Sequence, residues 1–167
     1  MDVSFQWIES PVGRLLLVGD EAGLRELAFA QGRTAPRLDP SWKNNGACLR
    51  EPVRQLRAFF AGELQDFDLP LNPQGTGFQL RVWSALQRIP FGETISYGEL
   101  ARRIGNPNGS RAVGLANGSN PIAIIIPCHR VIGSNGKLTG YGGGLENKRW
   151  LLDFEHSQFR LAFGRQA

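Results

Sequence analysis

Residues 96–119 read SYGELARRIGNPNGSRAVGLANGS, and this stretch decides the fold of the second half of the chain. Ser96 begins a capping box with the glutamate three residues later, which predicts the start of a short helix. Residues 106–109 predict a turn, and Ser110 is then placed to N-cap a second helix over residues 111–119. A helix, a short glycine-containing turn and a second helix are the outline of a helix-turn-helix.

Small residues dominate the second of these helices. Ala112, Gly114, Ala116 and Gly118 leave it thin, and Arg111 is its one long charged side chain. Two glycines inside a short helix cost about 1 kcal/mol each relative to alanine. A close approach to another surface would offset that cost, and the surface is either a neighbouring helix or a groove of DNA.

The first half of the chain predicts β structure followed by one helix. Apolar and polar residues alternate over residues 3–7, which predicts a half-buried strand, and further strands are expected near residues 14–18 and 24–29. A helix is expected over residues 49–61. Residues 66–75 contain two prolines and end in a glycine, a composition that predicts a linker.

The second half is predicted to be mostly helical. Thr76 opens it with a capping box, and a closing helix is expected over residues 145–156. We therefore expect a mixed α/β protein of the α+β kind. Residues 1–75 would form a small antiparallel β-sheet with a helix, and residues 76–167 a mostly helical domain with the helix-turn-helix and a short strand over residues 122–126.

Composition excludes several classes of protein. A chain of 167 residues with 41% hydrophobic and 20% charged residues is typical of a folded globular protein. No apolar run approaches the roughly 20 residues of a membrane-spanning helix, and the first residues lack the basic and apolar regions of a signal peptide. Two cysteines and two histidines provide neither a disulfide framework nor a structural zinc site. A cytoplasmic, reducing compartment is therefore expected.

The net charge of +4 is unevenly distributed along the chain. Residues 1–75 hold 8 Lys and Arg against 10 Asp and Glu, whereas residues 76–167 hold 11 against 5. A basic second half suits a polyanionic partner, because neutralised phosphates supply the sequence-independent part of nucleic-acid affinity. The alternative is a solvated surface that is basic without such a partner.

One short segment carries the residues suited to chemistry. The apolar strand expected over residues 122–126 runs directly into the sequence PCHR at residues 127–130. A thiol attacks at neutral pH only with a lowered pKa or a neighbouring base, and His129 is the candidate base for Cys128. Successive residues on a strand point to opposite faces, so a turn at the cysteine is needed. Glu155 is the candidate to orient the histidine; the alternative is a buried cysteine that packs as a small apolar residue.

These segments together resemble the signature of the O6-alkylguanine-DNA alkyltransferase family. The resemblance is collinear over most of residues 76–155 and much looser over the first 75 residues. Its segments are FGETISY at 91–97, RAVG at 111–114, NGSNP at 117–121, IPCHRV at 126–131 and GYGG at 140–143.

The resemblance implies roles for the residues around the cysteine. Cys128 would accept the alkyl group irreversibly, so that each molecule acts once. His129, held by Glu155, would draw the proton from Cys128 through a water molecule. Asn120 would stabilise the turn that joins the recognition helix to the acceptor segment.

The resemblance also implies how the substrate is bound. Tyr97 would rotate the nucleotide's phosphate and donate a hydrogen bond to guanine N3, and Arg111 would fill the space left by the extruded base, with Ser110 and Ala112 beside it on the DNA. Three further residues would shape the base pocket: Val131, Tyr141 and Gly142. In this family the helix-turn-helix lies in the minor groove, which accounts for its small residues.

The function implied is repair of double-stranded DNA carrying O6-alkylguanine by single-turnover transfer, with O4-alkylthymine as a second candidate substrate and a monomeric protein. No metal and no organic cofactor is expected, and the first half holds only Cys48 and no histidine as zinc ligands. Two other functions compete with this one. One is a binding-only relative, against which Cys128 argues, and the other is a cysteine hydrolase, which needs an oxyanion hole and turnover.

Overall fold

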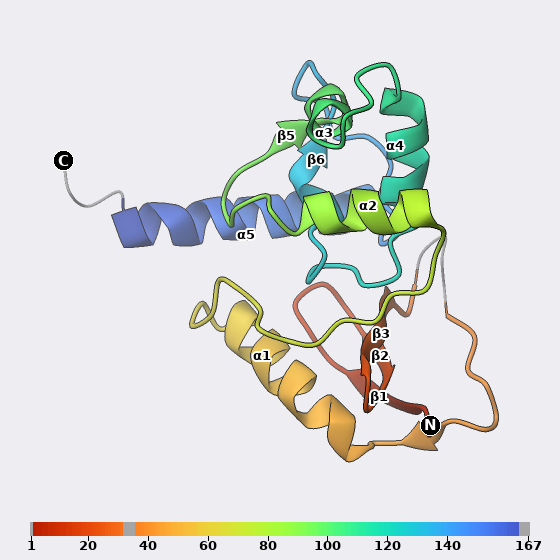
Figure 1. Cartoon of the computed structure of the whole chain (residues 1–167). Helices are drawn as coiled ribbons and strands as arrows, with labels where there is room; N and C mark the ends of the chain where they lie inside the picture. The colour runs from red at the N-terminus through yellow and green to blue at the C-terminus, as the bar shows by residue number, and fades with distance from the viewer. Residues whose placement is uncertain (1, 32–35, 164–167) are drawn as a thin grey trace. The chain divides into compact units, whose positions relative to one another are not determined.

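The structure, a computed structural model, describes residues 2–31 and 36–163 (Figure 1). The chain divides into two compact units. Unit 1 comprises residues 1–74 and 121–125, and unit 2 comprises residues 75–120 and 126–167. Each unit has its own sheet and its own helices. No helix within the described residues is long and apolar enough to cross a membrane.

The described residues of unit 1 form a four-stranded sheet and one α-helix, with the strand order β3-β2-β1-β4. The first three strands pair antiparallel, as the sequence predicts, and the short β4 adds to β1 in parallel. The central strand β2 is buried along its whole length. The elements are β1 (Ser4–Ile8), β2 (Leu15–Asp20), β3 (Gly23–Phe29), β4 (Lys43–Asn44), the 3₁₀ helix η1 (Ala47–Leu49) and α1 (Arg50–Phe60).

The linker predicted over residues 66–75 contains the boundary between the two units, but residues 68–72 are bonded to unit 1 and are not a free connection. The backbone of Leu24 in β3 donates to the Pro70 carbonyl at 2.9 Å and accepts from the Asn72 amide at 2.7 Å. The Gln55 side chain also holds the backbone of residue 68 at both its amide and its carbonyl. Proline removes a backbone donor but leaves its carbonyl as an acceptor, so a proline-rich segment can still run along a sheet edge.

The strand predicted over residues 122–126 is also wrong. Ile122 makes an isolated bridge to Leu27 within unit 1, and residues 122–126, all of which the structure describes, form no strand. Ile124 has a φ of 72°, a left-handed conformation that is uncommon for a β-branched residue and that ends any extended run. The five side chains are buried as expected. A short apolar run indicates burial more reliably than it indicates a strand.

Unit 2 is mostly helical, as predicted, and its helix-turn-helix is formed by α3 and α4. These two helices pack against each other and against α2, and the closing helix α5 extends beyond the predicted residue 156. The elements are α2 (Gly77–Leu86), β5 (Ile95–Ser96), α3 (Tyr97–Arg103), α4 (Ser110–Gly118), the 3₁₀ helix η2 (Cys128–Arg130), β6 (Val131–Ile132) and α5 (Leu145–Phe163).

A tryptophan of α2 fixes the position of α4. The buried indole of Trp83 donates a hydrogen bond from Nε1 to the Ala116 carbonyl at 2.8 Å. A Cβ atom at Gly75 would lie 2.5 Å from the Trp83 ring, so the chain needs glycine there. The thin helix α4 is thus packed closely against α2 on one side, while its residues 110–112 remain exposed.

The predicted helix starts differ in how they are capped. Thr76 forms the full capping box with Gln79. Ser96 accepts a hydrogen bond from the Glu99 amide, but the Glu99 carboxylate pairs with arginines one turn ahead and does not complete the box. The N-cap predicted at Ser110 is wrong, because Gly109 is the N-cap, without a side-chain cap hydrogen bond, and Ser110 is the first helical residue.

This difference predicts unequal effects of two alanine substitutions. Thr76→Ala should lower the free energy of unfolding by about 1 kcal/mol, because it removes a side-chain acceptor from a helix terminus. Ser110→Ala removes no such bond and should change it by less than about 0.5 kcal/mol. Urea unfolding of both variants measures this, and equal losses would contradict the capping seen here.

Candidate active site

Cys128, His129 and Arg130 form a tight turn rather than part of a strand. The Cys128 carbonyl accepts from the Val131 amide, and the Pro127 carbonyl accepts from the Arg130 amide at 3.0 Å. This turn supplies the change of direction that the sequence requires at the cysteine. All three side chains are buried, with exposed fractions of 6%, 0% and 6%. Cys128 is thus buried, as the alternative of a structural cysteine expects, but its thiol lies beside the polar side chains of Asn120 and Lys148.

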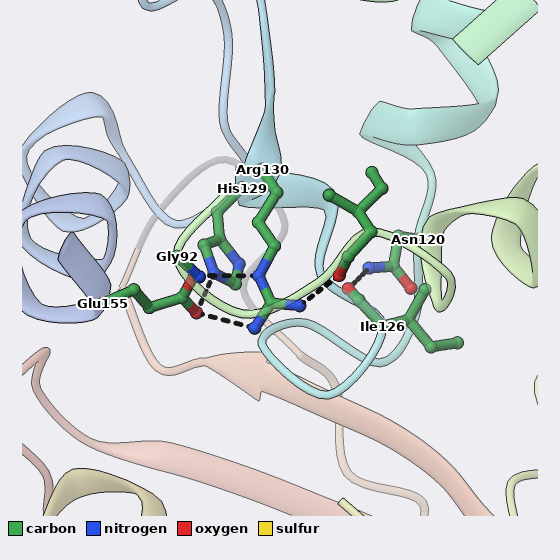
Figure 2. A network of polar contacts seen from close by, with 7 residues as sticks. Gly92, Asn120, Ile126, His129, Arg130 and Glu155 are labelled. Carbon is green, nitrogen blue, oxygen red and sulfur yellow. Dashed lines mark hydrogen bonds and ion pairs between the residues drawn. The ribbon is translucent and has the colours of Figure 1, made fainter. Parts of the chain in front are cut away.

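The carboxylate of Glu155, on α5, is shared by the histidine and the arginine (Figure 2). One oxygen, Oε2, lies 2.7 Å from His129 Nε2. Arg130 binds both oxygens, with Nε 2.8 Å from Oε1 and Nη2 2.9 Å from Oε2, and its Nη1 donates to the Ile89 carbonyl at 2.6 Å. The Gly92 amide adds a long hydrogen bond of 3.5 Å to Oε1. Two side chains that sequence reasoning placed together, His129 and Glu155, thus do meet.

The charges in this cluster fix the form of the histidine. Burial alone would raise the pKa of Glu155, but the hydrogen bonds and charges of His129 and Arg130 outweigh it and lower that pKa to about 2. An ionised carboxylate only accepts hydrogen bonds, so His129 carries its proton on Nε2. Burial also lowers the pKa of His129 itself, which keeps the ring neutral at pH 7. Its Nδ1 is buried and has no hydrogen-bond partner among residues 2–31 and 36–163.

The thiol of Cys128 is held in its protonated form in this state. Burial raises its pKa, and a hydrogen bond from Asn120 and the positive charge of Lys148 offset that rise only in part. The same Asn120 donates from Nδ2 to the Ile126 carbonyl at 2.7 Å. Asn120 therefore contacts residues on both sides of Pro127, the Ile126 carbonyl and the Cys128 thiol. Because the pKa of the thiol is raised, a base is needed to remove its proton.

Lys148 is a site residue that sequence reasoning missed. It is fully buried, and its Nζ donates to the Val131 carbonyl at 2.7 Å and to the Thr139 carbonyl at 2.9 Å. Burial lowers the pKa of its ammonium group. Helical spacing was the available signal, because Lys148 shares a face of α5 with the buried Leu151 and Glu155.

The residues expected to form the base pocket lie on three different segments of unit 2. Tyr97 is the first residue of α3, and its hydroxyl accepts from Thr139 Oγ1 at 3.1 Å. Val131 in β6 and Tyr141 are buried, and Gly142 is partly exposed. Burial raises the pKa of Tyr141 well above its usual value, so the phenol stays protonated.

The residues expected on DNA lie apart from this buried cluster. Ser110, Arg111 and Ala112 form the exposed first turn of α4, and Leu115 one turn later is 71% exposed. None of the four makes a contact with the carboxylate network. Among the described residues, no three His, Cys, Asp or Glu side chains gather as metal ligands.

Fold and site together define a thiol-dependent protein that carries a helix-turn-helix. Two family models match the chain: 6-O-methylguanine DNA methyltransferase, DNA binding domain, over residues 77–157, and its ribonuclease-like domain over residues 3–73. The chain belongs to the 6-O-methylguanine DNA methyltransferase family. This confirms the family named from the sequence.

Known relatives match over nearly the whole chain. A methylated-DNA–protein-cysteine methyltransferase of Methanosarcina acetivorans is 58% identical over 149 residues, 89% of this chain and 96% of the relative. The crystal structure of Mycobacterium tuberculosis O6-methylguanine methyltransferase is 52% identical with a TM-score of 0.84, and covers 93% of this chain and 94% of its own. OGT from the same organism in complex with DNA has a TM-score of 0.86 at the same identity and coverage. The α+β fold class is thereby confirmed.

The buried cluster predicts that stability falls in acid in two stages. The pKa of His129 is lower in the folded protein than its ordinary 6.5, so its contribution to stability is present above 6.5 and decreases as the pH falls below it. The pKa of Glu155 falls from 4.5 to about 2 on folding, so its contribution decreases between those values. Urea unfolding measured at a series of pH values tests both stages.

Glu155→Gln is the matched variant for this measurement. Its free energy of unfolding should be lower by about 3–5 kcal/mol at neutral pH, because the substitution leaves Arg130 buried without its counter-charge. The stage between pH 4.5 and about 2 should also become smaller. A free energy of unfolding that is independent of pH below 6.5 would contradict the assigned protonation states.

Proposed function

We propose that this chain repairs double-stranded DNA by transferring an alkyl group from O6 of guanine to Sγ of Cys128, irreversibly and once per molecule. Family membership supports alkyl transfer from DNA. The observation that carries the choice of acceptor is the burial of Cys128 next to His129, whose Nδ1 is an unoccupied proton acceptor. The other cysteine, Cys48, lies in η1 of unit 1.

The reaction is an in-line displacement at the alkyl carbon. Sγ of Cys128 forms a bond to that carbon as the bond between the carbon and guanine O6 breaks. The electron pair leaves with O6, and the guanine regains a proton in becoming the normal base. The thiol proton passes to His129 Nδ1 through a bridging water, and its release from the histidine balances the proton that guanine takes up. The product is a thioether, which is stable to hydrolysis. No metal or organic cofactor enters these steps.

Arg130 and Glu155 act on the reaction through the histidine. The ionised carboxylate accepts a hydrogen bond from Nε2–H, with Nε2 and Oε2 2.7 Å apart, and so presents Nδ1 as the basic nitrogen. When His129 takes the thiol proton, the adjacent carboxylate stabilises the imidazolium. The positive charge of Arg130 partly offsets the negative charge of Glu155. It thereby limits how far the pKa of His129 rises, so that the imidazolium can release its proton again.

The substrate must leave the base stack to reach Cys128. The acceptor is only 6% exposed, and the alkyl carbon of O6-alkylguanine sits inside the duplex, so the nucleotide has to be extruded. Arg111, on the exposed first turn of α4, would fill the vacated space, with Ser110 and Ala112 against the DNA backbone. The small residues of α4 suit insertion into the narrow minor groove.

Residues around the cysteine would hold the extruded base. Tyr97 would donate a hydrogen bond to guanine N3 and rotate the nucleotide's phosphate, while Val131, Tyr141 and Gly142 line the pocket. Lys148 supports this assignment, because its bonds to the carbonyls of residues 131 and 139 tie two pocket segments to α5. O4-alkylthymine is a second candidate substrate of the same pocket.

Three further features complete the proposal. We place a domain boundary at residues 75 and 76, close to the division between the two units, although residues 121–125 belong to unit 1. A cytoplasmic location suits a protein that depends on a free thiol, since both cysteines are unpaired. The protein would act as a monomer on DNA.

Cysteine substitutions test the acceptor directly. Cys128→Ser should abolish transfer from a duplex containing O6-methylguanine but leave DNA binding, because the thiol makes no phosphate contact. The matched Cys48→Ser should transfer normally. Intact-mass measurement after the reaction should show one added methyl group in the latter variant only.

The same measurement separates the competing functions. An unchanged mass in the unsubstituted protein would indicate a binding-only protein. Continued product release without added mass would indicate a hydrolase. Transfer that survives in Cys128→Ser and fails in Cys48→Ser would overturn the site.

Arg111 should matter only when a base has to be extruded. Arg111→Ala should slow repair of O6-methylguanine in duplex DNA by about tenfold or more, since unstacking costs a few kcal/mol. Reaction with free O6-benzylguanine should be unchanged. Arg54→Ala, which removes an exposed arginine of α1 in unit 1, controls for net charge. Equal losses on both substrates would contradict the role of Arg111.

A further inference from the structure

Asn117 is a buried polar residue that the mechanism above does not use. It lies in the last turn of α4 and is only 4% exposed. It shares the buried face of the helix with Val113 and Ala116, both apolar. An apolar side chain would suit this position, so the presence of an amide calls for a reason.

The Asn117 side chain contacts the acceptor cysteine. Its Nδ2 donates to the Cys128 carbonyl at 3.4 Å. Its Oδ1 is buried and has no hydrogen-bond partner within the described part of the chain. Exchanging the amide oxygen and nitrogen would set two oxygens against each other, so the orientation is fixed by chemistry. A buried acceptor without a partner costs folding free energy.

The hydrogen bond is not needed to close the turn at the cysteine. The Cys128 carbonyl already accepts from the Val131 amide, which forms η2. Asn117 occupies the second lone pair of that carbonyl. Asn120, three residues further on, holds the Ile126 carbonyl on the other side of Pro127. Asn117 in the last turn of α4 and Asn120 just beyond this helix thus hold the backbone on both sides of Pro127.

We infer that Asn117 is a positioning residue for alkyl transfer. Through the Cys128 carbonyl it fixes the direction in which Sγ points and couples that direction to the position of α4, which Trp83 holds at Ala116. The inference rests on the proposed function. Sγ must approach the alkyl carbon in line with the bond to O6, so a small rotation of the cysteine slows the reaction. The buried Oδ1 without a partner lowers the stability of the folded protein, and this loss accompanies the alignment of Sγ.

Apolar replacement separates positioning from packing. Asn117→Leu has a similar size and removes both the donor and the unpaired acceptor, and Asn117→Met provides a second replacement of this kind. The matched control is Val113→Ala, which loosens the same buried face of α4 without touching Cys128. Single-turnover transfer is measured against protein concentration, with duplex DNA containing O6-methylguanine and with free O6-benzylguanine, alongside thermal melting.

The expected result is a split between rate and stability. Asn117→Leu should melt at an unchanged or higher temperature. Its maximal rate should fall about fivefold on both substrates, the size that corresponds to one neutral hydrogen bond, with the half-saturating concentration unchanged. Val113→Ala should melt lower and keep its maximal rate.

Two outcomes would overturn the inference. One is an unchanged maximal rate in Asn117→Leu. The other is a loss of rate that follows the loss of melting temperature in both variants, which would assign Asn117 to packing. Failure of the unsubstituted protein to transfer the alkyl group would instead overturn the proposed function.

Discussion

The rest of the site depends on the buried interactions of the Glu155 carboxylate with His129 and Arg130. Glu155 is 1% exposed, and its carboxylate is held by His129 on one side and by the guanidinium of Arg130 on the other. Burying an unpaired carboxylate would cost a large amount of folding free energy, and the hydrogen bonds from His129 and Arg130 offset much of that cost. Because α5 supplies Glu155 and η2 supplies its partners, this pair also joins the closing helix to the acceptor turn (Figure 2).

A resting thiol beside a neutral base suits a protein that reacts once. Burial raises the pKa of Cys128, so the resting protein does not expose a thiolate to stray electrophiles or oxidants. Burial and Arg130 keep His129 neutral, which leaves Nδ1 ready to accept the proton once a substrate is in place. In the proposed reaction, this arrangement would protect an acceptor that is not regenerated.

Much of the fold was predictable from local signals. Alternation over residues 3–7 and the capping box at Thr76 act within a few residues, and both elements formed as predicted. The errors arose where distant contacts decide. Residues 122–126 look like a strand, yet Ile124 turns the chain, and residues 70–72 look like a linker, yet they bond to β3.

The site was predictable only in part. A family resemblance brought His129 and Glu155 together, although spacing alone could not place them side by side. Helical spacing could have pointed to Lys148, which shares a buried face of α5 with Glu155. The contact of Arg130 with Glu155 and that of Asn117 with the Cys128 carbonyl depend on three-dimensional packing, which the sequence does not reveal. Ser110 is a local signal that failed. Serine favours the N-cap position, but α4 begins one residue earlier than predicted, so that Gly109 is the N-cap.

Measuring the tautomer and charge of His129 tests most directly whether Glu155 holds this histidine as a neutral base with a bare Nδ1. Nitrogen NMR of protein labelled with ¹⁵N in histidine distinguishes a protonated ring nitrogen from a bare one. At pH 7 the ring should be neutral, with the proton on Nε2 and a bare Nδ1, and it should become protonated only below the ordinary pKa of 6.5. A ring that carries its proton on Nδ1, or an imidazolium at pH 7, would contradict this assignment.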